Sequence, residues 1–179
     1  VEVGDRISFA VGSAPERLQW AIDTAEAHLK KINRPRNSIQ LGAYINLVCD
    51  KDEKTALSLG TLIAGMVAHF AGLKHAPTEH LPHQLRTVAE HMQSQYDMER
   101  HAQDEGAHLA LIDEAFVDWF SICGPPEKCI ERLQPLLDMG LEHIYQLGGT
   151  PVAHPHAARQ IAMVEQAQLF ATDVIPHCR

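Results

Sequence analysis

The chain has 179 residues, enough for one domain with a sizeable core or for part of a larger one, and its 45% hydrophobic and 21% charged residues are ordinary for a folded protein. The formal net charge is −8 and there is no long basic run, which argues against a nucleic-acid-binding surface. No apolar run approaches the ~20 residues of a membrane span, and the opening VEVGD lacks the basic and apolar regions of a secretory signal, so we expect a cytoplasmic protein that does not contact membranes.

The four cysteines are Cys49, Cys123, Cys129 and Cys178, and none forms a close CxxC pair. Cys123 and Cys129 lie in apolar sequence. This usage is typical of reduced, buried thiols rather than of a disulfide framework, which agrees with a cytoplasmic location.

A short apolar run, RISFAV, opens the chain at residues 6–11 between two glycine-containing turns. Such a run predicts a strand buried on both faces, as in a parallel sheet. Ser13 to Glu16 (SAPE) reads as a capping box, and it is followed by apolar residues at helical spacing up to residue 32.

The second predicted strand, residues 40–48 (QLGAYINLV), has two different faces. One is aliphatic and should pack under helices. The other carries Tyr44 and Asn46, polar side chains that need partners if they are buried. We therefore weigh two roles for Tyr44 and Asn46, contact with a ligand or a structural hydrogen bond. Asp50 and Glu53 are expected to cap the next helix.

Residues 51–120 are read as a helical insertion within a single domain of residues 1–179. The segment Tyr96 to His101 (YDMERH) combines an aromatic, two acids, an arginine and a histidine on one predicted helix. It is either a solvated ion-pair face or an insertion helix that presents Arg100 and His101 over a substrate pocket.

The clearest local pattern lies at residues 116–149. Pro125-Pro126 opens a helix, Gly140 suits its C-terminal end, and residues 143–147 form a third strand that runs into Gly148 and Gly149. These two glycines are either a plain turn or a place where the backbone approaches a phosphate. A last helix is predicted at residues 157–172.

Twelve histidines raise the question of a metal site. The closest pairs, His80 with His83 and His154 with His156, lie in proline-containing loops without a cysteine or carboxylate at a recognised ligand spacing. We expect solvated loop histidines and no metal. There is also no nucleophile elbow, P-loop or complete dinucleotide fingerprint, so no catalytic residue is predicted.

Taken together, the segments GDRISFAVGSAPERLQWAIDTA, LGAYINLVCDKDEKTA, YDMERH, FVDWFSICGPPEKCIERL and MGLEHI resemble the C-terminal half of the luciferase-like flavin-dependent oxidoreductases, especially the branch that uses coenzyme F420. The resemblance runs from Val3 to Arg179. It implies an α/β fold, the C-terminal part of a TIM (β/α)₈ barrel with a helical insertion, in which residues 6–11, 41–48 and 143–147 are the last three strands.

The resemblance also implies reduced FMN or F420 at the mouth of the barrel, passing hydride to a small organic substrate or, for reduced FMN, activating oxygen in a monooxygenase. On a barrel, strand ends and inward polar residues face the ligand. The candidate cofactor-binding residues are Ser8, Phe9, Tyr44, Asn46, Gly148 and Gly149, and the candidate substrate residues are Arg100 and His101.

The chain departs from the family pattern in one respect, because it begins at a strand that the family's phosphate-binding loop normally precedes. We expect either a fragment of a longer enzyme or a half-barrel that acts as a binding or assembly module. The strand at residues 143–147 should then be an exposed edge or pair with another polypeptide, which predicts a homo-oligomer or pairing with the missing half-barrel.

Overall fold

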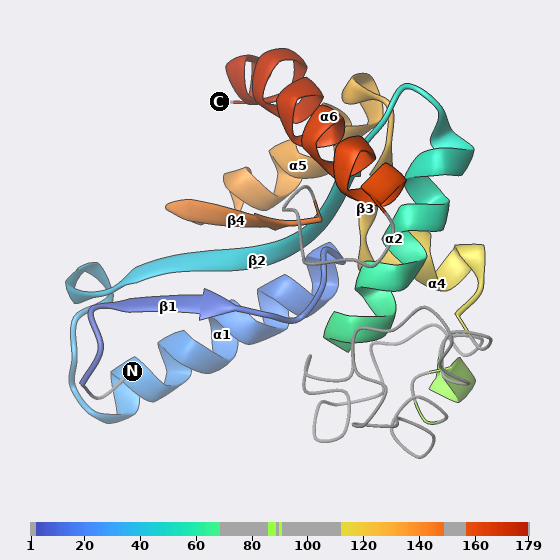
Figure 1. Ribbon diagram of the computed structural model, residues 1–179. Coiled ribbons are helices and arrows are strands. Elements are labelled where there is room, and N and C mark those ends of the chain that lie inside the picture. Colours follow the sequence, from blue (N-terminus) through green and yellow to red (C-terminus); the bar gives the residue numbers. More distant parts are fainter. Residues whose placement is uncertain (1–2, 69–85, 89, 91–111, 149–156, 179) are drawn as a thin grey trace.

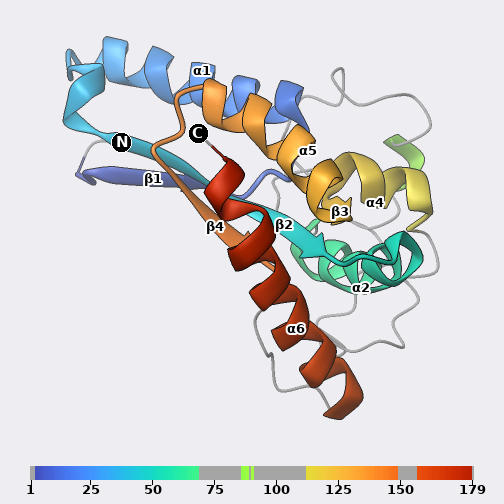
Figure 2. The same cartoon turned by 90° about the horizontal axis from the view of Figure 1, so that it is seen from above.

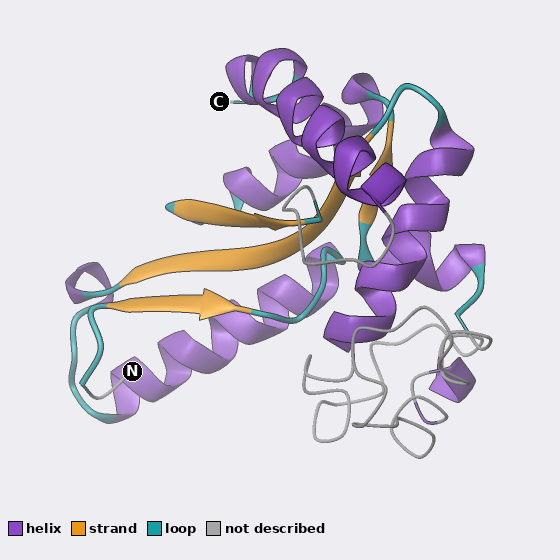
Figure 3. Cartoon of the chain, in the orientation of Figure 1, coloured by secondary structure: helices purple, strands orange, loops and turns teal. Residues whose placement is uncertain are grey.

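The computed structural model of the chain describes residues 3–68, 86–88, 90, 112–148 and 157–178 (Figure 1). Strands and helices alternate along its described parts, except that two described helices follow one another between the second and third strands (Figure 3). In chain order they are β1 (Arg6–Phe9), α1 (Pro15–Lys31), β2 (Gln40–Cys49), α2 (Glu53–Ala68), α4 (Glu114–Phe120), β3 (Ile122–Gly124), α5 (Pro126–Asp138), β4 (His143–Leu147) and α6 (Ala157–Asp173), with short 3₁₀ turns at Arg36–Ser38 and Ile175–His177.

All four strands are parallel, and β2 is the strand to which the others pair. Its first half lies between β1, where Arg6 is opposite Gln40, and β4, where His143 is opposite Gly42. Its C-terminal end pairs with β3, Leu47 opposite Ile122. A parallel sheet with helical crossovers confirms the predicted α/β class.

The sequence reading of three strands was wrong, because it missed β3. This strand has only three residues, Ile122, Cys123 and Gly124, all buried. Three residues between a helix and a proline are too few to display a period of two, so the pattern gave no sign of them.

Helices α1 and α5 cover one face of β1, β2 and β4, as the view from above shows (Figure 2). The aliphatic side chains of β2 on this face are at most 1% exposed, and they join residues of both helices in one core cluster. The prediction that this face packs under helices is confirmed. Its β2 members are Leu41, Ala43, Ile45 and Leu47.

A second core cluster forms at the C-terminal end of β2, where α2 and α4 pack against Val48, Cys123 and Leu147. Described residues of the predicted insertion, residues 51–120, are helical in α2, at 86–88 and 90, and in α4. Whether residues 51–120 form one insertion stays a prediction.

Two predicted helix caps differ from those observed. The N-cap of helix α1 is Ala14, which has no side-chain oxygen to accept a hydrogen bond, while the Ser13 N–H donates to Phe120 O at 2.9 Å. Before α2, the capping oxygen is Asp52 Oδ2, which accepts from Thr55 N at 3.0 Å, while Asp50 Oδ1 accepts from Asp52 N. Tertiary packing and a nearer carboxylate override the simple spacing rule in these two places.

The predicted start of the helix at Pro126, its end at Gly140 and the strand that follows are confirmed. Pro126 starts α5, Gly140 follows its end with φ +83°, and β4 has the predicted bounds. Among the described strands, β4 pairs only with β2, so its other edge is open there. In the described part of the chain, no helix is both long and apolar enough to cross a membrane.

Candidate functional site at the inner face of the sheet

The face of the sheet opposite α1 and α5, which we call the inner face, carries polar residues from three strands. Strand register puts Ser8 of β1, Gly42 of β2 and His143 of β4 in one row across it. The next row has Tyr44 beside Tyr145, and the third has Asn46 beside Leu147, nearest the C-terminal ends of the strands. Side chains in one row share a face because the period of a strand is two.

The first row is held together by a histidine that crosses a glycine. His143 Nε2 and Ser8 Oγ are hydrogen-bonded at 3.0 Å. A Cβ atom on Gly42 would overlap the His143 ring, closer than real Cβ contacts occur. Because residue 42 has no side chain, the His143 ring can lie over it and reach Ser8. Desolvation, with Arg6 nearby, lowers the pKa of His143, while Glu142 acts in the opposite direction, so the imidazole is neutral at pH 7.

The second row is a pair of stacked tyrosines. The Tyr44 and Tyr145 rings are 5.0 Å apart at an interplanar angle of 23°, and they remain 36% and 39% exposed. The His143 ring meets Tyr145 edge-on at 5.2 Å. Arg6 Nη1 donates to Tyr145 Oη at 3.3 Å. The two rings therefore stack on each other, with part of each ring exposed and the Arg6 guanidinium at one side.

Asn46, in the third row, is the least satisfied polar residue of the inner face. It is 1% exposed, and within the described structure neither its Oδ1 nor its Nδ2 has a hydrogen-bond partner. A buried amide without partners costs roughly 1–3 kcal/mol. By contrast Gln146, on the other face of β4, donates to Leu47 O at 3.2 Å.

Beyond Asn46, the end of β2 meets α6. Gln166 Nε2 donates to Asp50 Oδ2 at 2.8 Å, and a cavity of about 300 Å³ lies beside them. Lys51, Glu165 and Leu169 complete its lining. In parallel α/β sheets, ligands bind at the carboxyl ends of the strands, which is this end.

Gly148, which ends β4, has φ +119°, and a Cβ there would meet Leu47 O at 2.8 Å and Ile63 at 2.7 Å. The need for glycine at this position therefore comes from packing against the protein itself. A phosphate contact by Gly148 stays a prediction.

The remaining predicted site residues are Phe9, Gly149, Arg100 and His101. Phe9 packs with the cluster under α1 and α5, on the opposite face from Ser8. Gly149, Arg100 and His101 fall outside the described residues. The structure thus brings together Ser8, Tyr44 and Asn46 on one face, though their contact with a ligand stays a prediction.

Sequence reasoning missed Arg6, His143 and Tyr145. The alternation in β4 was the available signal, because His143, Tyr145 and Leu147 stand on one face of a strand whose ends were predicted correctly.

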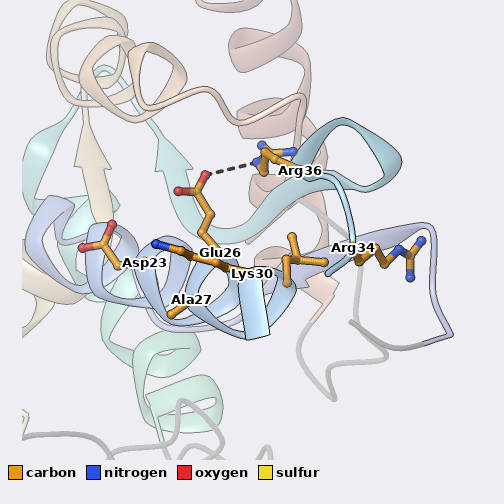
Figure 4. Close-up of a pocket in the computed structure, with 7 residues that line it drawn as sticks. Asp23, Glu26, Ala27, Lys30, Arg34 and Arg36 are labelled. Carbon is orange, nitrogen blue, oxygen red and sulfur yellow. Dashed lines mark hydrogen bonds and ion pairs between the residues drawn. The ribbon is translucent and has the colours of Figure 1, made fainter. Parts of the chain in front are cut away.

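A larger cavity, of about 560 Å³, lies at the other end of the sheet (Figure 4). It is formed by α1 and the turn before β2, and its lining includes Asp23, Lys30 and Arg34. Its arginines have carboxylate partners, Arg36 with Glu26 at 3.2 Å and Arg34 with Asp5 at 3.2 Å. It lies at the amino ends of the strands, and we do not consider it the functional site.

Cysteine and histidine side chains are the commonest ligands of structural zinc. All four cysteines are free, and Cys49, Cys123 and Cys129 are buried, as predicted. Burial raises the pKa of Cys123 to about 12, so it is a thiol at neutral pH. In the described part of the chain, no three His, Cys, Asp or Glu residues gather as a metal site would require, and His80, His83, His154 and His156 lie outside it.

Comparison with known proteins identifies the family. The sequence model for luciferase-like monooxygenases matches residues 1–143. The chain belongs to this family. The predicted resemblance to luciferase-like oxidoreductases is therefore confirmed.

Its relatives include three curated 5,10-methylenetetrahydromethanopterin reductases. Those of Methanopyrus kandleri and Methanolobus tindarius are each 26% identical, over 98% and 91% of this chain, and that of Archaeoglobus fulgidus is 23% identical over 98%. The chain spans 46–49% of the length of these three relatives.

A solved structure agrees in fold. The coenzyme F420-dependent tetrahydromethanopterin reductase of Methanopyrus kandleri superposes with a TM-score of 0.62 and 23% identity, over 99% of this chain and 46% of that one. The α/β fold with a parallel sheet is thus shared with that enzyme.

Proposed function

We propose that this chain is the C-terminal part of an oxidoreductase that works through reduced F420 or FMN on a small organic substrate. The observation that supports it best is the unpartnered amide of Asn46 on the inner face, in a chain of a family of oxidoreductases. Oxygen activation, as in a monooxygenase, is the form the reaction would take with FMN.

F420 is the better supported cofactor of the two. The solved relative is named as F420-dependent, and the curated relatives are named as reductases. We extend this to our chain as a proposal. When bound, such a cofactor supplies the hydride.

The residues of the inner face fit a planar, polar ring. Tyr44 and Tyr145 offer exposed aromatic surface, and Asn46 offers one acceptor and two donors. His143, neutral and fixed by Ser8, can hold a hydrogen bond without adding charge. These side chains would bind and orient the ring. We also propose that Gly148 and Gly149 contact the cofactor and that Arg100 and His101 contact the substrate.

The substrate is proposed to be a small molecule, with neither nucleic acid nor membrane as partner, and the location cytoplasmic. We also propose that the protein forms a homo-oligomer or pairs with a further half-barrel. Two observations support this. Tyr44 and Tyr145 on the inner face are each more than one-third exposed, and among the described strands β4 pairs only with β2, so one of its edges is unpaired there.

A second candidate is a half-barrel that binds or assembles without catalysing a reaction. The observation in its favour is that much of the inner face is already satisfied from within. Arg6 bonds to Gln40 at 2.8 Å and to Tyr145, and Ser8 to His143.

The two candidates are separated by purifying the protein expressed from its complete gene. The enzyme predicts a product about twice the 19.9 kDa of this chain and a visible absorption band from bound F420 or flavin. A product near 19.9 kDa without affinity for either cofactor supports the binding module and contradicts the enzyme.

A further inference from the structure

Asn46 stands out among the amide side chains of the sheet. Gln40 accepts from Arg6, and Gln146 donates to the backbone of Leu47. Asn46 alone among these three is almost completely buried, and in the described structure both of its amide atoms are left without a partner. Buried polar groups in native proteins are nearly always hydrogen-bonded, so an orphan of this kind needs an explanation.

The position of Asn46 favours a ligand as that missing partner. It lies on the inner face, one pleat nearer the carboxyl ends of the strands than the stacked Tyr44 and Tyr145. Ligands of parallel α/β sheets bind at those ends. A flat aromatic ligand placed against the exposed parts of the tyrosine rings would have an edge toward Asn46, the next residue of β2 on this face.

The chemistry of the amide narrows the class of ligand. A carboxamide places one acceptor and two donors in a plane. Its complement is a ring edge in which a C=O stands next to an N–H, so that two parallel hydrogen bonds form. A pyrimidinedione ring has such an edge, and fused with further aromatic rings it has the flat surface that the tyrosines would stack on.

We propose that Asn46 recognises the C=O/N–H edge of a fused pyrimidinedione and so sets the orientation of the ring on the Tyr44–Tyr145 pair. This rests on the proposed function, because flavins and deazaflavins carry such a ring, and it assigns the orientation to one side chain. Asn46 is here a positioning residue for the ring.

The test uses Asn46→Leu, which keeps the size and removes the polar atoms, and it has two readouts. Without ligand, Asn46→Leu should raise the melting temperature, because an unsatisfied buried amide is gone. Binding of F420, followed by fluorescence quenching, should weaken on the order of 10- to 100-fold for two lost hydrogen bonds. Ser121→Ala is the matched control, since Ser121 is also buried with an orphan hydroxyl in the described structure but belongs to the turn between α4 and β3.

A chemical variant tests the same contact from the ligand side. Methylation of the ring nitrogen between the two carbonyls removes the donor, so the methylated deazaflavin ring should bind the wild-type chain more weakly than the unmethylated ring. The two rings should bind Asn46→Leu equally. Where leucine prevents folding, Asn46→Ala carries the same comparison.

The outcomes are distinct. If the wild type binds F420 and Asn46→Leu binds it as tightly, the assignment of Asn46 is wrong while the proposed function stands. A lowered melting temperature with unchanged binding makes Asn46 a structural residue and overturns the inference in the same way. If the wild type binds neither F420 nor FMN, the proposed function itself fails.

Discussion

The contact between His143 and Ser8 depends on the absence of a side chain at position 42, and Gly42→Ala tests this directly. The added methyl group falls on the imidazole, so His143 must turn away. The variant then loses the hydrogen bond to Ser8, about 1 kcal/mol, and the edge contact with Tyr145, about 1 kcal/mol. Replacing glycine by alanine in a strand by itself stabilises the folded state by roughly 0.5–1 kcal/mol. We expect a net loss of about 1 kcal/mol.

The decisive comparison is made in a His143→Ala background. There the methyl group meets no imidazole, so Gly42→Ala should stabilise by roughly 0.5–1 kcal/mol, and the coupling between the two positions should be about 2 kcal/mol. Urea unfolding of the four proteins gives this number. Gly140→Ala is the control, because its φ of +83° is strained for alanine in either background while nothing lies within 4 Å of its Cβ. An equal effect of Gly42→Ala in both backgrounds would refute the reasoning.

Three further predictions follow from other contacts. The folded-state pKa of His143 lies below its unfolded value of 6.5, so the stability from its neutral form is full above pH 6.5 and is lost as pH falls through the folded pKa. The difference in urea midpoint between wild type and His143→Gln should therefore shrink on acidification. A difference that stays constant with pH would contradict this prediction. In the native protein an iodoacetamide-type reagent should label Cys178 and leave the three buried cysteines unreacted until urea is added, as intact mass will show; rapid native labelling of a second thiol would contradict their burial. Arg17→Met should lower the free energy of unfolding by about 2–3 kcal/mol, because it leaves Val11 O without its donor and removes a guanidinium held 5.9 Å from both Trp20 and Trp119. Urea unfolding followed by tryptophan fluorescence measures this loss. A loss below about 0.5 kcal/mol would show that these contacts do not stabilise the fold significantly.

The sequence predicted those parts of the fold whose signals are local and repeated. The two faces of β2 could be told apart because ten residues give a clear period of two, and α5 because Pro126 and Gly140 mark its ends. Strand β3 could not be found, since its three residues belong to the sheet only through pairing with β2. The same holds for the cap of α1, where Phe120, more than one hundred residues away, takes the N–H of Ser13.

The candidate site was predictable in kind but not in composition. Tyr44 and Asn46 could be named because polar residues interrupt an otherwise apolar strand. His143 could not be assigned its place, because its contact with Ser8 needs the register of three strands and the empty space over Gly42. Phe9 was assigned to the site from its position near a strand end, but its parity puts it under the helices. The sequence of one strand shows which residues share a face, but only the packing of α1 and α5 shows which of the two faces these helices cover.

The most direct test of the central claim is a titration of F420, with FMN in parallel, against the protein expressed from its complete gene. The account predicts saturable binding of F420, with a perturbed visible band, that weakens in Asn46→Leu and is unchanged in Ser121→Ala. Failure of the wild-type protein to bind either cofactor would contradict it.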